Sequence, residues 1–270
     1  MPTIQEAVNQ IKLNLEQAIR TNGEIGKLSL IRSQKPIKLI HEAVKSELIA
    51  NQITSSRIHP SLGVSEGEIT LSGFLKKKSQ DIVVFPSGIE PIEEIIDSGF
   101  LEGKTDSFGN NFTERVLSIN VRSQLSSLAK NFDTLYERTF AEALNFHLRC
   151  PNMCLGEVYM IPVYEYDTRN AQDNIISFSR GFGNVEKYLL AFNAIAGRIT
   201  TTSNLYKYEQ VCLLIVDFSN EIPKIYSSDE ELKRDGLLSQ DSTASIANLT
   251  FDRFIPSLLE TYRARFPNLI

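Results

Sequence analysis

The hydrophobic positions in the first fifty residues repeat at helical spacing. The first stripe consists of Ile4, Val8, Ile11, Leu15 and Ile19, and the pair Asn22-Gly23 ends it. Because neighbours on one helix face lie three or four residues apart, the stripe predicts an amphipathic helix. A second helix is predicted from Pro36 over PIKLIHEAVKSELIAN, since proline is favoured in the first helical turn.

The orientation of this second helix separates its two central glutamates. Its apolar face consists of Ile37, Ile40, Val44 and Leu48. At about 100° per residue, Glu47 lies about 70° from the centre of that face and Glu42 about 150° away. Glu47 is therefore expected to point inward past the edge of the core, and Glu42 toward water. The alternative, that both glutamates are solvated, is the commoner arrangement.

Two strand-like runs follow in GEITLSGFLKKKSQDIVVFP. They cover residues 68–75 and 80–85, and the short lysine-rich segment between them predicts an antiparallel hairpin. Asp81 opens the second strand, and strict alternation places its side chain on the face of Val83 and Phe85. Asp81 is thus either a turn residue at the start of a buried strand or a carboxylate placed to bind a ligand.

From Leu117 onward the pattern alternates with a period of two. Leu117, Ile119 and Val121 form the apolar side, and the polar side consists of Ser118, Asn120, Arg122 and Gln124. Such a strand can line a polar cleft, or it can be an edge strand whose outer face is wet. A long amphipathic helix from Leu128 follows directly, and Ser126 or Ser127 is expected to cap it.

The remaining elements repeat this style and predict one α/β domain. Strands are predicted in MCLGEVYMIPV, which carries Glu157, and in EQVCLLIVDFS, whose continuous apolar run is typical of burial on both faces. Helices are predicted in NVEKYLLAFNAIAGR and FDRFIPSLLETYRARF, and Gly181-Phe-Gly183 is interpreted as a turn. We expect an N-terminal helix over residues 1–30, a core over 31–165, and a C-terminal extension of the same domain over 166–270.

Composition narrows the functional classes. The chain of 270 residues has a formal net charge of −5, so contact with nucleic acid requires a local basic patch. The cluster Lys76, Lys77 and Lys78 is the candidate patch, and a solvated hairpin tip is the alternative explanation. The odd number of cysteines, three, indicates a reducing compartment, and the polar N-terminal segment is neither a signal peptide nor a membrane span. We therefore expect a cytoplasmic protein that does not enter a membrane.

The order helix, strand, strand, strand, helix, strand, with an acid opening the second strand, resembles the PD-(D/E)XK nuclease core. It is most similar to the type II restriction endonucleases. The segment KKKSQDIVVF resembles the strand that bears the metal-binding aspartate of that family, and LSINVRSQLSSLAKN lies where its E-x-K strand belongs. The resemblance covers about residues 36–163, and INVRSQLSSLAKNFDTLYERTFAEALN also resembles the two-subunit enzymes that cut CCTNAGC-type sites.

This resemblance implies a restriction-endonuclease-like fold, with a mixed central sheet flanked by helices. It also implies a magnesium-dependent site on double-stranded DNA and assembly as a homodimer or heterodimer. The expected catalytic residues are Asp81, Glu47, Asn120, Arg122 and Gln124. The expected magnesium ligands are Asp81, Glu47 and Glu157, and the expected DNA contacts are Lys76, Lys77 and Lys78.

The sequence also departs from the family pattern. Asn120 and Arg122 occupy the places of the glutamate and the lysine. Asparagine offers a hard cation only a neutral oxygen, and arginine keeps its proton near neutral pH. The missing carboxylate would come from Glu47 or Glu157, while Arg122 would stabilise charge on the phosphate.

Three functions therefore stay open. The first is a type II site-specific deoxyribonuclease, which explains the order of elements. The second is a catalytically weak nuclease-fold subunit that recognises DNA or a partner, which explains the missing glutamate and lysine. The third is an unrelated α/β enzyme that acts on a small molecule, for which the sequence contains no cofactor motif.

Overall fold

A computed structural model describes residues 1–64, 66–182 and 184–269. Its centre is a six-stranded mixed sheet in the order β1-β4-β7-β8-β11-β12. The strands are β1 (Ile58–His59), β4 (Ile82–Val84), β7 (Leu117–Ser123), β8 (Cys154–Pro162), β11 (Gln210–Asp217) and β12 (Lys224–Ile225). Strands β7, β8 and β11 run parallel, and the outer strands β1, β4 and β12 join them in antiparallel pairs.

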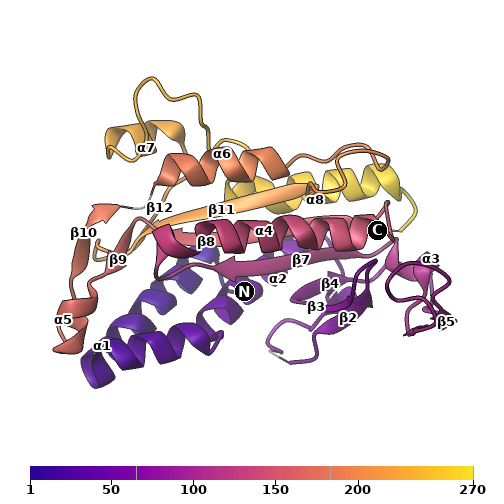
Figure 1. Cartoon of the computed structure of the whole chain (residues 1–270), viewed down its shortest axis with the longest axis horizontal. Coiled ribbons are helices and arrows are strands. Elements are labelled where there is room, and N and C mark those ends of the chain that lie inside the picture. The colour runs from indigo at the N-terminus through magenta and orange to yellow at the C-terminus, as the bar shows by residue number, and fades with distance from the viewer. Residues whose placement is uncertain (65, 183, 270) are drawn as a thin grey trace.

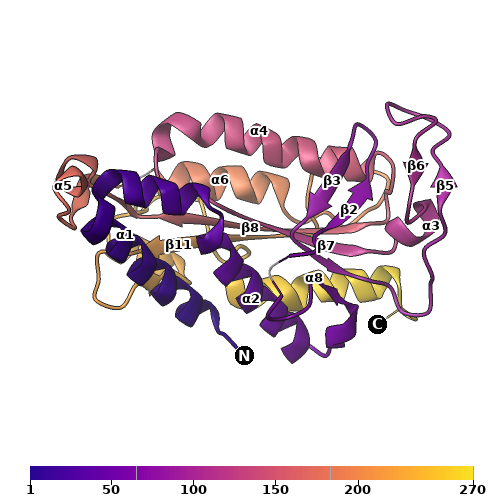
Figure 2. The same cartoon turned by 90° about the horizontal axis from the view of Figure 1, so that it is seen from below.

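Helices cover both faces of this sheet (Figure 1). One face is covered by α1 (Ile4–Arg32), α2 (Lys35–Ala50) and α8 (Phe251–Arg265), and the other by α4 (Leu128–His147) and α6 (Val185–Ile195), as Figure 2 shows. The expected fold class, a mixed sheet flanked by helices with an N-terminal helical segment and a C-terminal helix, is confirmed. Because β11 pairs with β8, the residues after 165 extend the same sheet.

Strand β7 has the predicted two-sided character. Leu117, Ile119 and Val121 pack into the core beneath α2 and α8. Ser118 and Asn120, on the other face, are also buried, with exposures of 0% and 4%. The edge-strand interpretation is wrong, because β7 lies between β4 and β8. Its polar face is buried in the interior of the protein.

A hairpin is present, but the two expected strands do not pair with each other. Strand β2 (Ile69–Ser72) pairs with β3 (Lys77–Gln80) in a separate two-stranded sheet, so Lys77 and Lys78 belong to a strand rather than to the turn, and the strand expected over residues 80–85 is β4 of the central sheet. Only Asp81 separates β3 from β4 of the central sheet. The chain therefore changes from one sheet to the other at Asp81.

Asn145 of α4 holds the turn of this hairpin. Its Oδ1 accepts hydrogen bonds from the backbone N–H of Leu75 (2.8 Å) and Lys76 (3.0 Å), and its Nδ2 donates to Lys76 O (3.1 Å). Gly73 makes the close approach possible, since a Cβ there would lie 2.6 Å from Asn145 O. The turn is fixed to the C-terminal part of α4.

The remaining helices and strands are short and lie outside the central sheet. They are η1 (Ser55–Arg57), β5 (Glu94–Ile95), β6 (Thr105–Asp106), α3 (Asn110–Thr113), β9 (Tyr164–Tyr166), α5 (Thr168–Gln172), β10 (Phe178–Phe182) and α7 (Asp229–Arg234). The helix α1 bends at Asn22-Gly23, where the predicted end of a helix is a kink and the chain continues helically. Gly181, expected in a turn, lies in β10, and Gly183 is outside the described residues.

A buried ionic cluster ties the C-terminal helix to the sheet. Glu209 lies 2.8 Å from Arg198, 2.7 Å from Arg265 at the end of α8, and 3.5 Å from His147. It also accepts a 2.7 Å hydrogen bond from the N–H of Leu155 in β8. Four separate segments thus meet at the carboxylate of Glu209.

Candidate active site

Asp81 is bound to the neighbouring strand by its own carboxylate. Its Oδ2 accepts a 2.7 Å hydrogen bond from the N–H of Val121 in β7, and the Asp81 N–H points at Asn120 Oδ1, 3.4 Å away. His41 of α2 lies 3.9 Å from the same Oδ2. Asp81 therefore contacts β7 and α2 at the point where the chain passes from β3 of the hairpin to β4 of the central sheet.

The face expected for Asp81 is wrong because the strand is interrupted there. Val83 packs on the α4 side of the sheet, whereas the Asp81 carboxylate lies beside His41 of α2, which covers the opposite side. Gln80 occupies the α4 side instead, and its Oε1 accepts hydrogen bonds from Ser118 Oγ and Asn120 Nδ2. The interruption at Asp81 removes the simple alternation on which the expectation rested.

Arg122 lies at the centre of the buried charges beside Asp81. Its guanidinium donates to Glu157 Oε1 (2.6 Å) and Thr139 Oγ1 (2.9 Å), and it forms an ion pair with Glu142. Lys78 of β3 forms a second ion pair with the same Glu142 oxygen. Asp81, Glu142 and Glu157 are here named the carboxylate cluster; Arg122 and Lys78 are its counter-ions.

Burial dominates the ionisation of this cluster. It raises the pKa of Asp81 to about 6, against the opposing hydrogen bond from Val121. It raises the pKa of Glu157 to about 8, although Arg122 acts in the other direction. Burial alone would lower the pKa of Arg122, but Glu157 and Glu142 outweigh it and hold that pKa well above its usual range. Arg122 thus remains a cation at the centre of the site.

The wall formed by α2 is neutral at the point nearest Asp81. Burial, together with the smaller effects of the Lys45 and Lys38 charges, lowers the pKa of His41 to about 4. His41 is therefore uncharged near neutral pH, while Lys38 adds a positive charge nearby. Sequence patterns gave no reason to single out His41, because a lone histidine on a helix is most often a packing residue.

Four of the residues expected at the site are joined by hydrogen bonds or ion pairs around Glu142 and Arg122. They are Asn120, Arg122, Glu157 and Lys78. Asp81 adjoins them through its backbone N–H, which points at Asn120 Oδ1, while its carboxylate lies on the α2 side. Gln124 is buried on a neighbouring stretch, where its Oε1 accepts hydrogen bonds from Tyr159 and Tyr188 and its amide binds the first turn of α4. It holds the beginning of that helix.

Glu47, Lys76 and Lys77 lie apart from the carboxylate cluster. Glu47 is half-buried, and within the described ranges no side-chain contact joins it to Asp81. Lys77 donates to Thr105 O at 2.5 Å, and Lys76 is exposed at the hairpin turn. Glu42, which was expected to face water, accepts from Lys45 (2.7 Å) and from the N–H of Gly63 (2.6 Å).

Glu142 is the site residue that the sequence interpretation missed. It comes from α4, and its side chain is 1% exposed. Its Oε1 accepts from Asn120 Nδ2 (3.1 Å), so it reaches the place where the resemblance would put a glutamate of β7. A signal existed: Glu142 follows Thr139 and precedes Phe146 at helical spacing, which places an acid in the buried stripe of the helix.

The oxygen atoms of the carboxylate cluster are of the kind that magnesium binds, but the described side chains are not arranged as a complete metal site. Carboxylate oxygens are the ligands that magnesium prefers, and one or two of them suffice when a substrate phosphate supplies others. Glu157 Oε2 is buried and has no hydrogen-bond partner among the described residues. Among the residues that the structure describes, however, no three His, Cys, Asp or Glu side chains converge as a ready-made metal site.

Comparisons with protein-family models, curated proteins and solved structures found no match to this chain. Within the described residues, no helix combines the length and apolar character needed to cross a membrane.

Proposed function

We propose that this chain is a nuclease-fold protein that binds double-stranded DNA and hydrolyses its phosphodiester bonds, in the manner of a type II restriction endonuclease. The observation that carries the proposal is the meeting of Asp81 from the second strand of the core with Asn120 and Arg122 from the third. Within the central sheet and the helices that cover it, the chain order α2, β1, β4, β7, α4, β8 supports it, with β1 in the place of the strand expected over residues 68–75, which lies in the separate hairpin.

The carboxylate cluster and its counter-ions suit this chemistry. Asp81 and Glu157 would hold magnesium, whose bound form supplies a more acidic water and neutralises charge on the phosphate. Arg122 and Lys78 would stabilise negative charge that develops on the phosphate oxygens. Glu142 orients both cations, because it pairs with each of them.

The direct test is incubation of the purified protein with plasmid and phage DNA, with magnesium or with a chelator. Discrete fragments that appear only with magnesium, and that disappear in Asp81→Asn, are the expected result. Asp97→Asn, at an exposed aspartate away from the cluster, is the matched control and should cleave normally. Equal cleavage by Asp81→Asn would contradict the assignment of the site.

A second candidate is a catalytically weak nuclease-fold subunit that recognises DNA or assembles with an active partner. The pairing of Arg122 with both Glu142 and Glu157 favours it, because these carboxylates are already neutralised by the protein itself. This candidate predicts DNA binding without cleavage, with or without magnesium. A gel-shift assay run beside the cleavage assay separates the two.

We also propose a cytoplasmic location. Cys150, Cys154 and Cys212 are free and buried, which suits a reducing compartment, and the proposed substrate is DNA.

A further inference from the structure

His41 of α2 faces the carboxylate of Asp81 at a distance too long for a hydrogen bond. Its Nε2 lies 3.9 Å from Asp81 Oδ2, and this nitrogen is buried without a hydrogen-bond partner among the described residues. The residue as a whole is 8% exposed. Because a buried polar atom without a partner costs free energy, such atoms are few in folded proteins. The two residues are here named the His41–Asp81 pair.

The two facing atoms have the chemistry and nearly the spacing of metal ligands. Imidazole nitrogen and carboxylate oxygen bind divalent transition metals at about 2.1 Å, so two such ligands on one ion lie about 3.0–3.6 Å apart. A closing movement of about half an ångström would bring Nε2 and Oδ2 to that spacing. The Asp81 side chain is 25% exposed, so an ion can approach from water. Water or a phosphate oxygen would fill its other coordination positions.

The charges on the sheet side of the pair favour a cation. Glu68 directly precedes β2, and its negative charge acts on Asp81. The positive charge of Arg122 acts on Asp81 in the opposite direction, but the guanidinium is already paired with Glu142 and Glu157. A cation bound at Asp81 would therefore meet net negative charge on this side.

The charges on the helix side are positive and only partly compensated. Lys45 and Lys38 both act on His41. Lys45 forms an ion pair with Glu42 at 2.7 Å, so its charge is largely neutralised within α2. Asp81 and Glu68 together are thus set against Lys38, and the balance around the pair still favours a cation.

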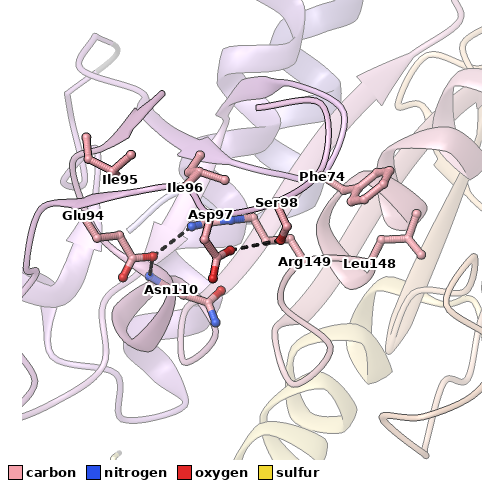
Figure 3. A pocket seen from close by; sticks show the side chains of 9 residues that line it. All are labelled: Phe74, Glu94, Ile95, Ile96, Asp97, Ser98, Asn110, Leu148 and Arg149. Carbon is pink, nitrogen blue, oxygen red and sulfur yellow. Dashed lines mark hydrogen bonds and ion pairs between the residues drawn. The ribbon is translucent and has the colours of Figure 1, made fainter. Parts of the chain in front are cut away.

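The carboxylates near the hairpin turn lack this arrangement. A cavity of about 410 Å³ opens there, and its polar wall includes Glu94, Asp97 and Arg149 (Figure 3). Glu94 accepts from Arg149 (3.0 Å) and from the N–H of Asn110 (2.7 Å), and Asp97 accepts from Ser98 Oγ (3.0 Å). The described residues that line the cavity include no histidine. These carboxylates already have partners in the protein, in contrast to the nitrogen of His41.

We propose that His41 and Asp81 together bind one divalent transition-metal ion between α2 and the sheet. The inference deepens the proposed function and rests on it in one respect, since it adds a nitrogen ligand to the metal that Asp81 would hold there. Imidazole nitrogen suits transition metals, whereas magnesium favours oxygen ligands. The pair therefore selects an ion such as Co²⁺ or Mn²⁺ over Mg²⁺.

Isothermal titration calorimetry of the full chain without an affinity tag, with CoCl₂ or MgCl₂, tests this selectivity. The wild type should bind one Co²⁺ per chain at least about tenfold more tightly than Mg²⁺. His41→Gln should weaken Co²⁺ binding at least about tenfold and change Mg²⁺ binding less than about threefold, and Asp81→Asn should weaken both. The matched controls are His59→Gln in β1 and Asp97→Asn at the hairpin-turn cavity, which should bind both ions like the wild type.

Electron spin echo spectroscopy of bound Mn²⁺ keeps the test decisive even if a variant does not fold, which circular dichroism checks. Echo modulation from a directly bound nitrogen is expected in the wild type. Oxygen-only coordination in the wild type, or Co²⁺ binding that a folded His41→Gln protein retains in full, would overturn the inference.

Cleavage of plasmid DNA by the same samples separates this inference from the proposed function. A wild type that binds Co²⁺ through His41 but cleaves no DNA with magnesium, manganese or cobalt would contradict the nuclease activity and support the metal site. A wild type that cleaves DNA with magnesium and binds Co²⁺ no more tightly than Mg²⁺ would support the nuclease activity and overturn the role of His41.

Discussion

The charged form of the Asp81 carboxyl lowers the stability of the folded protein. Its pKa is raised from 3.8 to about 6, chiefly by burial. A carboxyl whose folded pKa lies above its unfolded value destabilises the fold fully above the folded pKa, and this penalty is relieved as the pH falls toward the unfolded pKa. Such a cost is retained where a carboxylate has a function, and it is open to measurement.

Asp81→Asn should therefore stabilise the protein at neutral pH. We expect the free energy of unfolding to rise by on the order of 2 kcal/mol at about pH 7.5 and to change little below about pH 4, where the wild-type carboxyl is also protonated. Urea unfolding at both pH values measures the difference. A variant that is less stable at neutral pH would mean that the hydrogen bond from Val121 outweighs burial.

Arg122 should be the most sensitive residue of the site with respect to stability. Arg122→Met leaves Glu142 and Glu157 buried without a guanidinium, and removal of one partner of a buried ion pair costs about 3–5 kcal/mol. The triple variant Arg122→Met/Glu142→Gln/Glu157→Gln removes the unpaired charges and should recover most of the loss. If the triple variant is no more stable than the single one, the ion pairs are not the cause.

The residue scale also shows where sequence interpretation succeeds and where it fails. Asn120 and Arg122 were found because their strand alternates strictly, and alternation survives folding. The face expected for Asp81 is wrong, because a single unpaired residue between β3 and β4 leaves no trace in the hydrophobic pattern. Glu142 was missed because it reaches the cluster from α4 across a tertiary contact, which no local period records.

At the scale of elements, the three consecutive lysines of the hairpin differ in their contacts. Lys78 reaches the carboxylate cluster, while Lys77 binds Thr105 O and Lys76 is exposed at the turn. Lys38 lies on α2 near His41. We therefore narrow the expected DNA contacts of the hairpin to Lys78 and add Lys38.

Lys38→Gln/Lys78→Gln should weaken DNA binding and reduce the slope of log K against log salt by about 2, since each phosphate contact contributes about one counter-ion. Lys76→Gln/Lys77→Gln should leave the slope nearly unchanged. Fluorescence anisotropy with a duplex oligonucleotide at several salt concentrations gives both values. Equal slopes for the two variants would return the whole lysine cluster to the DNA interface.

Helix α8 and strand β8 pack closely enough to require glycine at position 156. A Cβ on Gly156 would lie 2.8 Å from side-chain atoms of Leu258 and Phe254. Gly156→Ala should cost about 1–3 kcal/mol, as overpacking of a core does. In a double-mutant cycle with Leu258→Ala the two losses should be less than additive, since the smaller side chain makes room. Additive losses would place the strain elsewhere.

The start of α4 shows why an element can be predicted while its cap cannot. Ser126 or Ser127 was the expected cap, but Ser127 has a left-handed backbone and makes no side-chain cap. The carboxylate of Glu165 accepts instead from the N–H groups of Ser127 (2.6 Å) and Leu128 (3.1 Å). A cap contributed by a residue 37 positions away can be found only once the sheet order is known.

For the whole molecule, the ionic cluster at Glu209 joins segments that are distant in the chain. Burial alone would raise the pKa of Glu209, but His147 and Arg265 outweigh it and lower the pKa to about 2. A carboxylate with a lowered folded pKa contributes stability above its unfolded pKa, and the contribution is lost as the pH falls through the folded value.

Glu209→Gln should consequently destabilise the protein by about 3–5 kcal/mol at neutral pH, because Arg198 and Arg265 lose their buried partner. The difference from the wild type should shrink as the pH falls from about 4.5 toward 2. Thermal unfolding followed by circular dichroism at several pH values measures this. A difference that does not depend on pH would exclude charge as the cause.

The fold class could be predicted because long buried strands make up the centre of the sheet. Strands β8 and β11 are continuous apolar runs that pattern alone identifies, and the fold class follows from them. The short strands β1 and β12 have two residues each, too few to carry a period, so the order of the sheet could not be derived. The pairing of β7 with β8 in that order places Glu157 opposite Asn120.

The hairpin is held at both ends, by the single-residue junction at Asp81 and by the hydrogen bonds between its turn and Asn145 of α4. Between these ends Lys78 pairs with Glu142 of the same helix. A shift of α4 would therefore move the hairpin and Lys78 with it. Any ligand of the carboxylate cluster that favours one position of α4 would be thermodynamically linked to the contacts that α4 makes elsewhere, and each must change the other by the same factor.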